Sequence, residues 1–98
     1  MAEVRLRRAA TVDLAEVLSY SRDTHGAEAA RRYAVRFRAA FALLRQHPGA
    51  APLLDWLEPP ARSLLCGRHR ILYEVEGETV WIGRILHVSR DLKSWPEA

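Results

Sequence analysis

Cysteine, lysine and long hydrophobic runs are scarce or missing in this sequence of 98 residues. Its only cysteine, Cys66, excludes an internal disulfide framework and favours a reducing compartment. No apolar run approaches the roughly 18 residues that a membrane-spanning helix requires, which excludes a transmembrane protein. Residues 1–8 lack the apolar segment and the cleavage site of a secretory signal peptide. We therefore expect a cytoplasmic protein with no membrane partner.

Motifs for metals, nucleotides and nucleophilic catalysis are absent as well. No spacing resembles a zinc site, because the histidines fall in different predicted elements. They are His25, His47, His69 and His87. There is no Gly-rich phosphate loop, no Gly-x-Ser-x-Gly and no signal of paired catalytic carboxylates. The sequence places no base beside Cys66, which favours a buried strand residue over a nucleophile. We expect neither a metal nor a cofactor.

Arginine, by contrast, is abundant. The chain is 49% hydrophobic and 28% charged, as is typical of a single soluble domain over residues 1–98. Residues 1–47 hold nine arginines and five acidic residues, so the net charge of +3 originates in this half. Because guanidinium groups bind carboxylates and phosphates bidentately, the surface suits an acidic protein or a nucleic acid. Solvated helix faces without a partner are the alternative.

Two helices are predicted in the first half, after a short strand over residues 3–8. The first helix begins with Thr11 as its N-cap and Asp13 in its first turn, and Gly26 ends it. The second extends from about residue 27 to residue 46, because its apolar residues recur at intervals of three and four. Those residues are Ala30, Tyr33, Ala34, Phe37, Phe41 and Leu44. We expect the two helices to form a hairpin.

The period changes to two after a proline-rich loop. Residues 48–60 contain four of the five prolines, and we expect Trp56 to pack its ring against the domain from this loop. Strands are predicted over residues 62–66, 68–76 and 79–88. Gly77 and Glu78 form the type II′ turn of a hairpin. The order β-α-α-β-β-β predicts an α+β fold, with the helical hairpin packed on one face of an antiparallel sheet and nothing left to cover the other.

Pairing across that turn assigns side chains to the two faces of the sheet, because Glu76 then pairs with Thr79. The face beneath the helices holds Ile71, Tyr73, Val75, Val80, Ile82 and Leu86. The open face holds Arg70, Leu72, Glu74, Trp81, Ile85 and His87. Arg84 falls on the apolar face unless a bulge near Gly83 turns it, which we favour. The open face is either a shallow site for a phosphate or an acidic strand, or an ordinary solvent face with cross-strand charge pairs.

Short motifs follow one another along nearly the whole chain. The clearest stretches are Arg62-Ser63-Leu64, His69-Arg70-Ile71-Leu72-Tyr73, Val80-Trp81-Ile82-Gly83-Arg84-Ile85-Leu86-His87 and Arg90-Asp91. The others are residues 4–14, Tyr20, Gly26, Ala29-Ala30-Arg31-Arg32-Tyr33 and His47-Pro48-Gly49. Together they resemble toxins of the ParE/RelE superfamily of type II toxin–antitoxin systems. The closing Ile-Leu-His-x-x-Arg-Asp pattern resembles the ParE branch more closely.

The resemblance implies a ParE-like toxin that arrests growth by poisoning DNA gyrase, without being an enzyme itself. It also implies a hetero-oligomer with a cognate antitoxin, which we expect to be acidic and partly disordered. The expected contact surfaces are the basic helical hairpin, the open sheet face and the tail from residue 87 to residue 95. The residues expected to bind partners are Arg31, Arg38, Arg70, Trp81, His87, Arg90 and Trp95.

RelE-like members instead cut mRNA in the ribosome, and this is the first alternative. Carried over to this chain, Arg70 matches the phosphate-binding arginine, Arg90 falls near the second arginine, and His87 serves as general acid. The lysines that RelE-type enzymes place ahead of this strand have no counterpart here. Their C-terminal tyrosine is also missing. A second alternative is an inactive relative that only binds the antitoxin.

Overall fold

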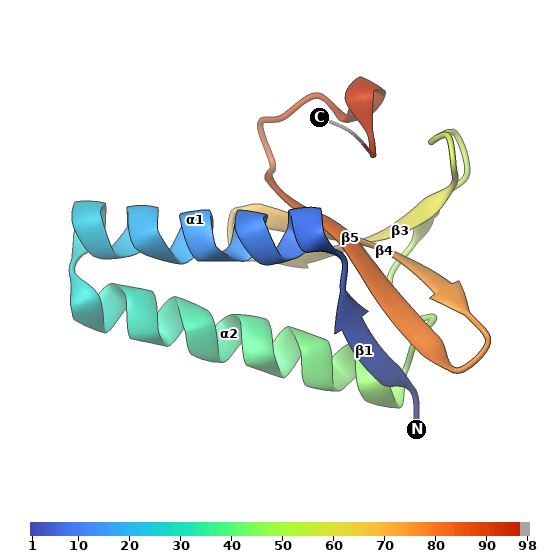
Figure 1. The fold of residues 1–98 in the computed structure, drawn as a ribbon, viewed down its shortest axis with the longest axis horizontal. Coiled ribbons are helices and arrows are strands. Elements are labelled where there is room, and N and C mark those ends of the chain that lie inside the picture. The colour runs from blue at the N-terminus through green and yellow to red at the C-terminus, as the bar shows by residue number, and fades with distance from the viewer. Residues whose placement is uncertain (97–98) are drawn as a thin grey trace.

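The computed structural model describes residues 1–96 as two helices packed against a five-stranded sheet (Figure 1). The elements are β1 (Glu3–Leu6), α1 (Arg8–His25), α2 (Ala27–Gln46), β2 (Leu53–Leu54), β3 (Ala61–Cys66), β4 (His69–Glu76), β5 (Thr79–His87) and a short 3-10 helix, η1 (Leu92–Ser94). The strand order is β1-β5-β4-β3-β2. The α+β class is confirmed. Neither helix of the described chain has the length and apolarity to cross a membrane.

The sheet differs from the prediction in two respects. It is mixed and not antiparallel throughout, because β1 lies parallel to β5 while the other pairs are antiparallel. The helical hairpin and the strands that follow it bring β5 back beside β1 in the same direction. The loop before β3 also contributes the two-residue edge strand β2, which has too few residues to show a period in the sequence.

The helical hairpin is confirmed, but α1 begins earlier than predicted. Its N-cap is Arg7, whose own N–H donates to the carbonyl of Ile82 at 2.8 Å. The chain therefore turns from β1 directly into the helix. Thr11 lies within α1, where its hydroxyl donates to the carbonyl of Arg7 at 3.3 Å and caps nothing. Asp13 consequently lies in the second turn, where its carboxylate is free to reach β5.

The main core lies between the helices and the sheet. Phe37 and Leu44 of α2 are buried there, as the apolar spacing predicts. The sheet contributes Ile71, Tyr73, Val80, Ile82 and Ile85 to the same cluster. The Tyr73 hydroxyl donates to the carbonyl of Pro48 at 2.7 Å, so this buried polar group is satisfied.

A bulge at Gly83 reverses the faces of the last part of β5. Tyr73 pairs with Ile82 and Leu72 with Arg84, so Gly83 is left without a partner. The bulge is confirmed, but the faces predicted beyond it are wrong. Ile85 joins the core under the helices, and Leu86 lies on the opposite face. His87 also changes sides, because side chains alternate along a strand.

The second face of the sheet is covered, and the prediction that it is open is wrong over this area. Leu72 and Leu86 are buried there under Leu57 from the loop and Trp95 from the tail. Figure 1 shows the loop and the red C-terminal segment near the same end of the sheet. Trp56, expected to pack, is 64% exposed, because its neighbour Leu57 takes the inward position.

Candidate functional site

The structure does not assemble the three residues of the nuclease alternative. Arg70 lies on the second face, half-buried, with its Nη1 donating to the hydroxyl of Ser63 at 3.4 Å. His87 lies on the helix side, opposite His69. Arg90 follows β5 and lines a hollow together with His87. The Gly83 bulge is the reason, since it turns His87 away from the face that carries Arg70.

The other residues predicted to bind partners are spread over three surfaces. Arg31 and Arg38 are exposed on α2, and Arg31 forms an ion pair with Glu28 at 2.6 Å. Trp81 is half-buried on the second face, where the guanidinium carbons of Arg5 and Arg7 lie 5.8 and 4.7 Å from its ring. A guanidinium over an indole face at such distances is attracted to the ring.

Trp95, one of the residues predicted to bind a partner, is buried. Only 6% of its surface is exposed, and its indole N–H donates to the carbonyl of Pro59 at 2.8 Å. A Cβ on Gly83 would approach Trp95 Cη2 to 2.5 Å, so the bulge residue must be a glycine for the ring to lie there. The tail is therefore part of the fold at this point.

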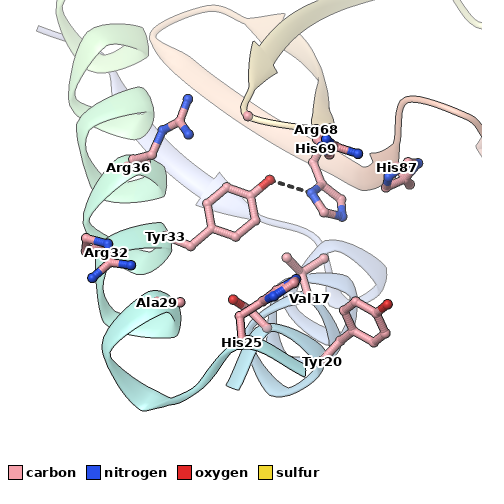
Figure 2. A pocket seen from close by; sticks show the side chains of 12 residues that line it. Val17, Tyr20, His25, Ala29, Arg32, Tyr33, Arg36, Arg68, His69 and His87 are labelled. Carbon is pink, nitrogen blue, oxygen red and sulfur yellow. Dashed lines mark hydrogen bonds between the residues drawn. The ribbon is translucent and has the colours of Figure 1, made fainter. Parts of the chain in front are cut away.

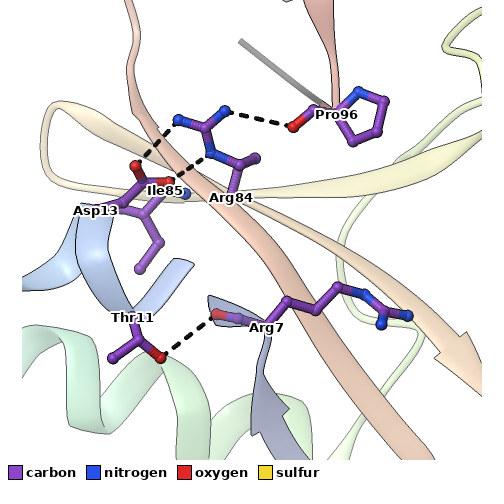
Figure 3. A network of polar contacts seen from close by, with 6 residues as sticks. All are labelled: Arg7, Thr11, Asp13, Arg84, Ile85 and Pro96. Carbon is purple, nitrogen blue, oxygen red and sulfur yellow. Dashed lines mark hydrogen bonds and ion pairs between the residues drawn. The ribbon is translucent and has the colours of Figure 1, made fainter. Parts of the chain in front are cut away.

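An ion pair joins α1 to β5 at the bulge (Figure 3). The Arg84 guanidinium donates to the two carboxylate oxygens of Asp13 at 2.7 and 3.0 Å. The same carboxylate accepts the backbone N–H of Ile85 at 2.9 Å. This N–H lies on the edge of β5 beyond Ile82, where the pairing with β1 has ended. Arg84 also donates to the carbonyl of Pro96 at 3.3 Å. Hydrogen bonding to Asp13 raises the pKa of Arg84 and keeps it charged.

A groove between α2 and β3 offers an apolar surface. It has a volume of about 300 Å³ and is lined by Arg36, Ala39, Ala40, Leu43, Leu64, Leu65 and Cys66. Leu43 and Leu65 are 41% and 59% exposed. The edge strand β2 pairs only with Ala61 and Arg62, so within residues 1–96 the outer edge of β3 beyond Ser63 has no neighbouring strand. An extended peptide can pair with such an edge.

Another hollow lies where the helical hairpin meets the turn between β3 and β4 (Figure 2). Its volume is about 530 Å³. The residues that line it are Val17, Tyr20, Ser21, His25, Ala29, Arg32, Tyr33, Arg36, Gly67, Arg68, His69 and His87. We call it the hairpin pocket. Figure 2 shows Tyr33 extending from α2 across the pocket to His69.

Tyr33 connects the helices to the sheet in this pocket. Its hydroxyl donates to the carbonyl of Cys66 at 2.9 Å and lies 2.5 Å from His69 Nδ1. Gly67 permits this approach, since its φ is +59° and a Cβ there would lie 2.9 Å from the Tyr33 ring. Burial, followed by the proximity of His87, lowers the pKa of His69. Burial also raises the pKa of Tyr33 and that of Cys66, which keeps both groups neutral.

Sequence reasoning did not find the His69–His87 pair. The two rings meet edge to face with centroids 5.3 Å apart. A hairpin without a bulge would place His69 opposite Leu86, and only the extra residue at Gly83 brings His87 into register. Nothing resembling a metal site accompanies the pair: within residues 1–96 no three His, Cys, Asp or Glu side chains are grouped to hold an ion.

Comparisons with known proteins agree with this architecture. Residues 4–92 match the family described as the ParE toxin of the type II toxin–antitoxin system parDE. Toxin ParE1 of Caulobacter vibrioides is 33% identical over 94 residues, which cover 96% of this chain and 97% of that protein. A solved structure described as a chromosomal ParDE toxin–antitoxin system from P. aeruginosa superposes with a TM-score of 0.76. That match covers 89% of this chain and 96% of the other at 21% identity, and it supports the fold.

Proposed function

The chain belongs to the ParE toxin family of type II toxin–antitoxin systems, and on this premise we propose that it arrests growth by poisoning DNA gyrase until a cognate antitoxin neutralises it. The family match over residues 4–92 is the observation that carries the proposal. The separation of Arg70 from His87 on opposite faces weighs against the ribosomal nuclease, which needs its cations and its acid around one phosphate. The toxin acts in the cytoplasm as an inhibitor and needs no cofactor.

The antitoxin binds the groove between α2 and β3 and forms a hetero-oligomer with the toxin. An amphipathic or extended segment would bury the exposed side chains of Leu43 and Leu65, while the free edge of β3 offers backbone hydrogen bonds. Arg36 at the rim, with Arg31 and Arg38 on the exposed side of the same helix, favours an acidic partner. A disordered segment that folds on binding can cover such a long surface.

Gyrase contacts exposed cations and a half-buried aromatic ring outside that groove. The candidates are Arg5, Arg7 and Trp81 at one end of the second face, and Arg90 and Lys93 in the tail. Arginine and tryptophan are the side chains that most often dominate binding energy at interfaces. Removing the whole tail would also remove Trp95 from the core, so truncation cannot separate binding from folding.

The proposal is tested by adding the purified chain to gyrase and DNA and measuring supercoiling and cleaved DNA, with mRNA from a translation reaction mapped in parallel. We expect lost supercoiling or accumulated cleaved DNA, and intact mRNA. Cleavage of mRNA at ribosomal positions with gyrase unaffected would overturn the proposal in favour of the nuclease. Growth that is unaffected by expression without the antitoxin would instead indicate an inactive relative.

Two sets of variants assign the surfaces. Leu43→Asp places a charge in the groove and should weaken antitoxin binding at least tenfold, whereas Val35→Asp, also exposed on α2 but outside the groove, should not. The double variant Arg90→Ala/Lys93→Ala should weaken gyrase poisoning and leave antitoxin binding unchanged. Equal antitoxin affinity for the two α2 variants would place the antitoxin elsewhere.

A further inference from the structure

The hairpin pocket has the size of a small-molecule site. Its volume of about 530 Å³ is within the range of roughly 300–1,000 Å³ typical of ligand pockets. Four separate parts of the chain form its walls: the end of α1, the start of α2, the β3–β4 turn and the end of β5 (Figure 2). Such a site is preorganised by the fold, because helices and strands hold its side chains in place.

The charge of the pocket has one sign. Arg32, Arg36 and Arg68 line it, and no aspartate or glutamate is among its lining residues. Arg32 has Glu28 nearby at 3.9 Å, but neither Arg36 nor Arg68 forms an ion pair within residues 1–96. A concave surface with unbalanced guanidinium groups attracts anions and binds phosphate oxygens well.

The hydrogen bonds define how the histidine pair is protonated. Because the Tyr33 hydroxyl donates to the Cys66 carbonyl, it accepts from His69, which must carry its proton on Nδ1. His87 Nδ1 accepts the backbone N–H of Ser89 at 3.1 Å, so Nε2 is the ring nitrogen of His87 that can donate. His69 is left with an unprotonated Nε2, a group that can take a proton when an anion arrives.

Apolar and aromatic surface completes the pocket. Tyr33 packs against Phe37 with ring centroids 4.8 Å apart, so its ring is fixed in the wall. Tyr20 stands on the rim and is 67% exposed, which leaves its face available for stacking. Val17 adds apolar surface to the lining of the pocket. A phosphate alone would use none of this surface, whereas an aromatic base linked to a phosphate would use it well.

We propose that the hairpin pocket binds a nucleoside monophosphate, with the phosphate beside Arg68 and the histidine pair. The base then lies against Tyr20 and Val17. Nothing in this inference requires gyrase to be the toxin's target. It adds a small-molecule site to a protein otherwise expected to act through macromolecular surfaces, and it gives cellular nucleotides a way to compete with any partner that covers the mouth of the pocket.

The experiment is an NMR titration of the full chain with adenosine 5′-monophosphate, adenosine and inorganic phosphate in separate arms. We expect the nucleotide to shift the amide signals of Gly67, Arg68 and His69, and to raise the pKa of His69, since an anion favours its charged form. Adenosine and phosphate should each bind at least tenfold more weakly than the nucleotide. Shifts with phosphate equal to those with the nucleotide would reduce the proposal to a simple anion site and overturn it.

Matched arginine variants locate the phosphate. Arg68→Ala removes the side chain of an exposed turn residue and should weaken nucleotide binding at least tenfold without affecting folding. Arg38 is exposed on α2 outside the pocket, so Arg38→Ala should leave the affinity for the nucleotide unchanged. Tyr20→Ala should weaken the binding of the nucleotide but not that of phosphate. Equal affinity for Arg68→Ala and Arg38→Ala would overturn the proposal, as would binding of an acidic peptide in the pocket without binding of the nucleotide.

Discussion

The two faces of the sheet are covered by different kinds of structure. The first lies under α1 and α2, and Phe37 and Leu44 enter its core from one regular helix. The second lies under a proline-rich loop and a short tail, from which Leu57 and Trp95 reach Leu72 and Leu86. On the first face the buried residues of the covering helix recur every few positions. On the second face the cover depends on single side chains at irregular positions in the sequence.

This difference determines how each face is stabilised. A helix buries apolar side chains on several successive turns, so many contacts together stabilise its packing on the sheet. The loop and the tail have no such repeated contacts. Individual hydrogen bonds hold them, from the Trp95 indole N–H to the Pro59 carbonyl and from Arg84 to the Pro96 carbonyl. The Asp13–Arg84 pair links these two systems, because Asp13 belongs to α1 and Arg84 reaches the tail. Substitutions on either side test the comparison.

The largest loss of stability is expected from Phe37→Ala, on the helix-covered face. Its side chain is fully buried and contacts both Tyr33 and Phe41, so the substitution should cost about 3–5 kcal/mol. Urea denaturation followed by circular dichroism measures this. Phe41→Ala is the matched control and should cost less, since Phe41 is only partly buried. Equal losses would mean that α2 does not present Phe37 to the core as described.

The next largest effect is expected from Asp13→Ala, which breaks the link between α1 and the cover formed by the loop and the tail. Asp13 and Arg84 are 13% and 11% exposed, so removing the carboxylate leaves a poorly solvated guanidinium and an unpaired Ile85 N–H. We expect a loss of about 3 kcal/mol, against less than about 0.5 kcal/mol for the exposed Asp23→Ala. Denaturation of both variants provides the measurement. A neutral Asp13→Ala would mean that the pair does not hold α1 to β5.

The sequence predicts the helix-covered side well, for a physical reason. The periodic apolar residues of α2 and the alternation around Gly77 are local signals, and they were sufficient to place both helices and the β4–β5 hairpin. The turn residues fix the register next to the turn. Glu76 opposite Thr79 and Tyr73 opposite Ile82 follow from that alone, and both pairs are confirmed.

The second face and the hairpin pocket depend on information that local patterns lack. The position of Gly83 suggests a bulge, but whether the following side chains exchange faces depends on the whole strand. Trp95 lies in a polar tail without periodicity, and its burial requires the space that Gly83 leaves. The pairing of His69 with His87 follows from the same bulge. The histidine pair of the hairpin pocket was therefore not predictable without knowing how the Gly83 bulge shifts the register.

A smaller loss is expected from Gly83→Ala, which acts on the loop-and-tail cover. The added methyl group would overlap the Trp95 ring, so the ring must move, at a cost of about 2 kcal/mol. The indole N–H of Trp95 should then exchange with solvent faster, because its bond to the Pro59 carbonyl is disturbed. Denaturation and NMR measure the two effects. Gly49→Ala, where a Cβ has open space, should change neither quantity.

The smallest effect is the pH dependence that His69 adds at the boundary of the helix-covered face. Burial and His87 lower its pKa below the ordinary 6.5, so the unfolded chain binds a proton more readily than the folded one. Stability should therefore be constant above about pH 6.5 from this source and should fall as the pH drops toward the lowered pKa. The proximity of His87 opposes protonation too, Arg36 and Arg68 line the same pocket, and Tyr33 and Cys66 stay neutral in this range. His69→Asn should flatten the profile of unfolding midpoint against pH between pH 7.5 and pH 5, whatever it costs in absolute stability. A profile that keeps its slope in this variant would assign the pH dependence to other groups and would show that His69 is not held in its neutral form by the fold.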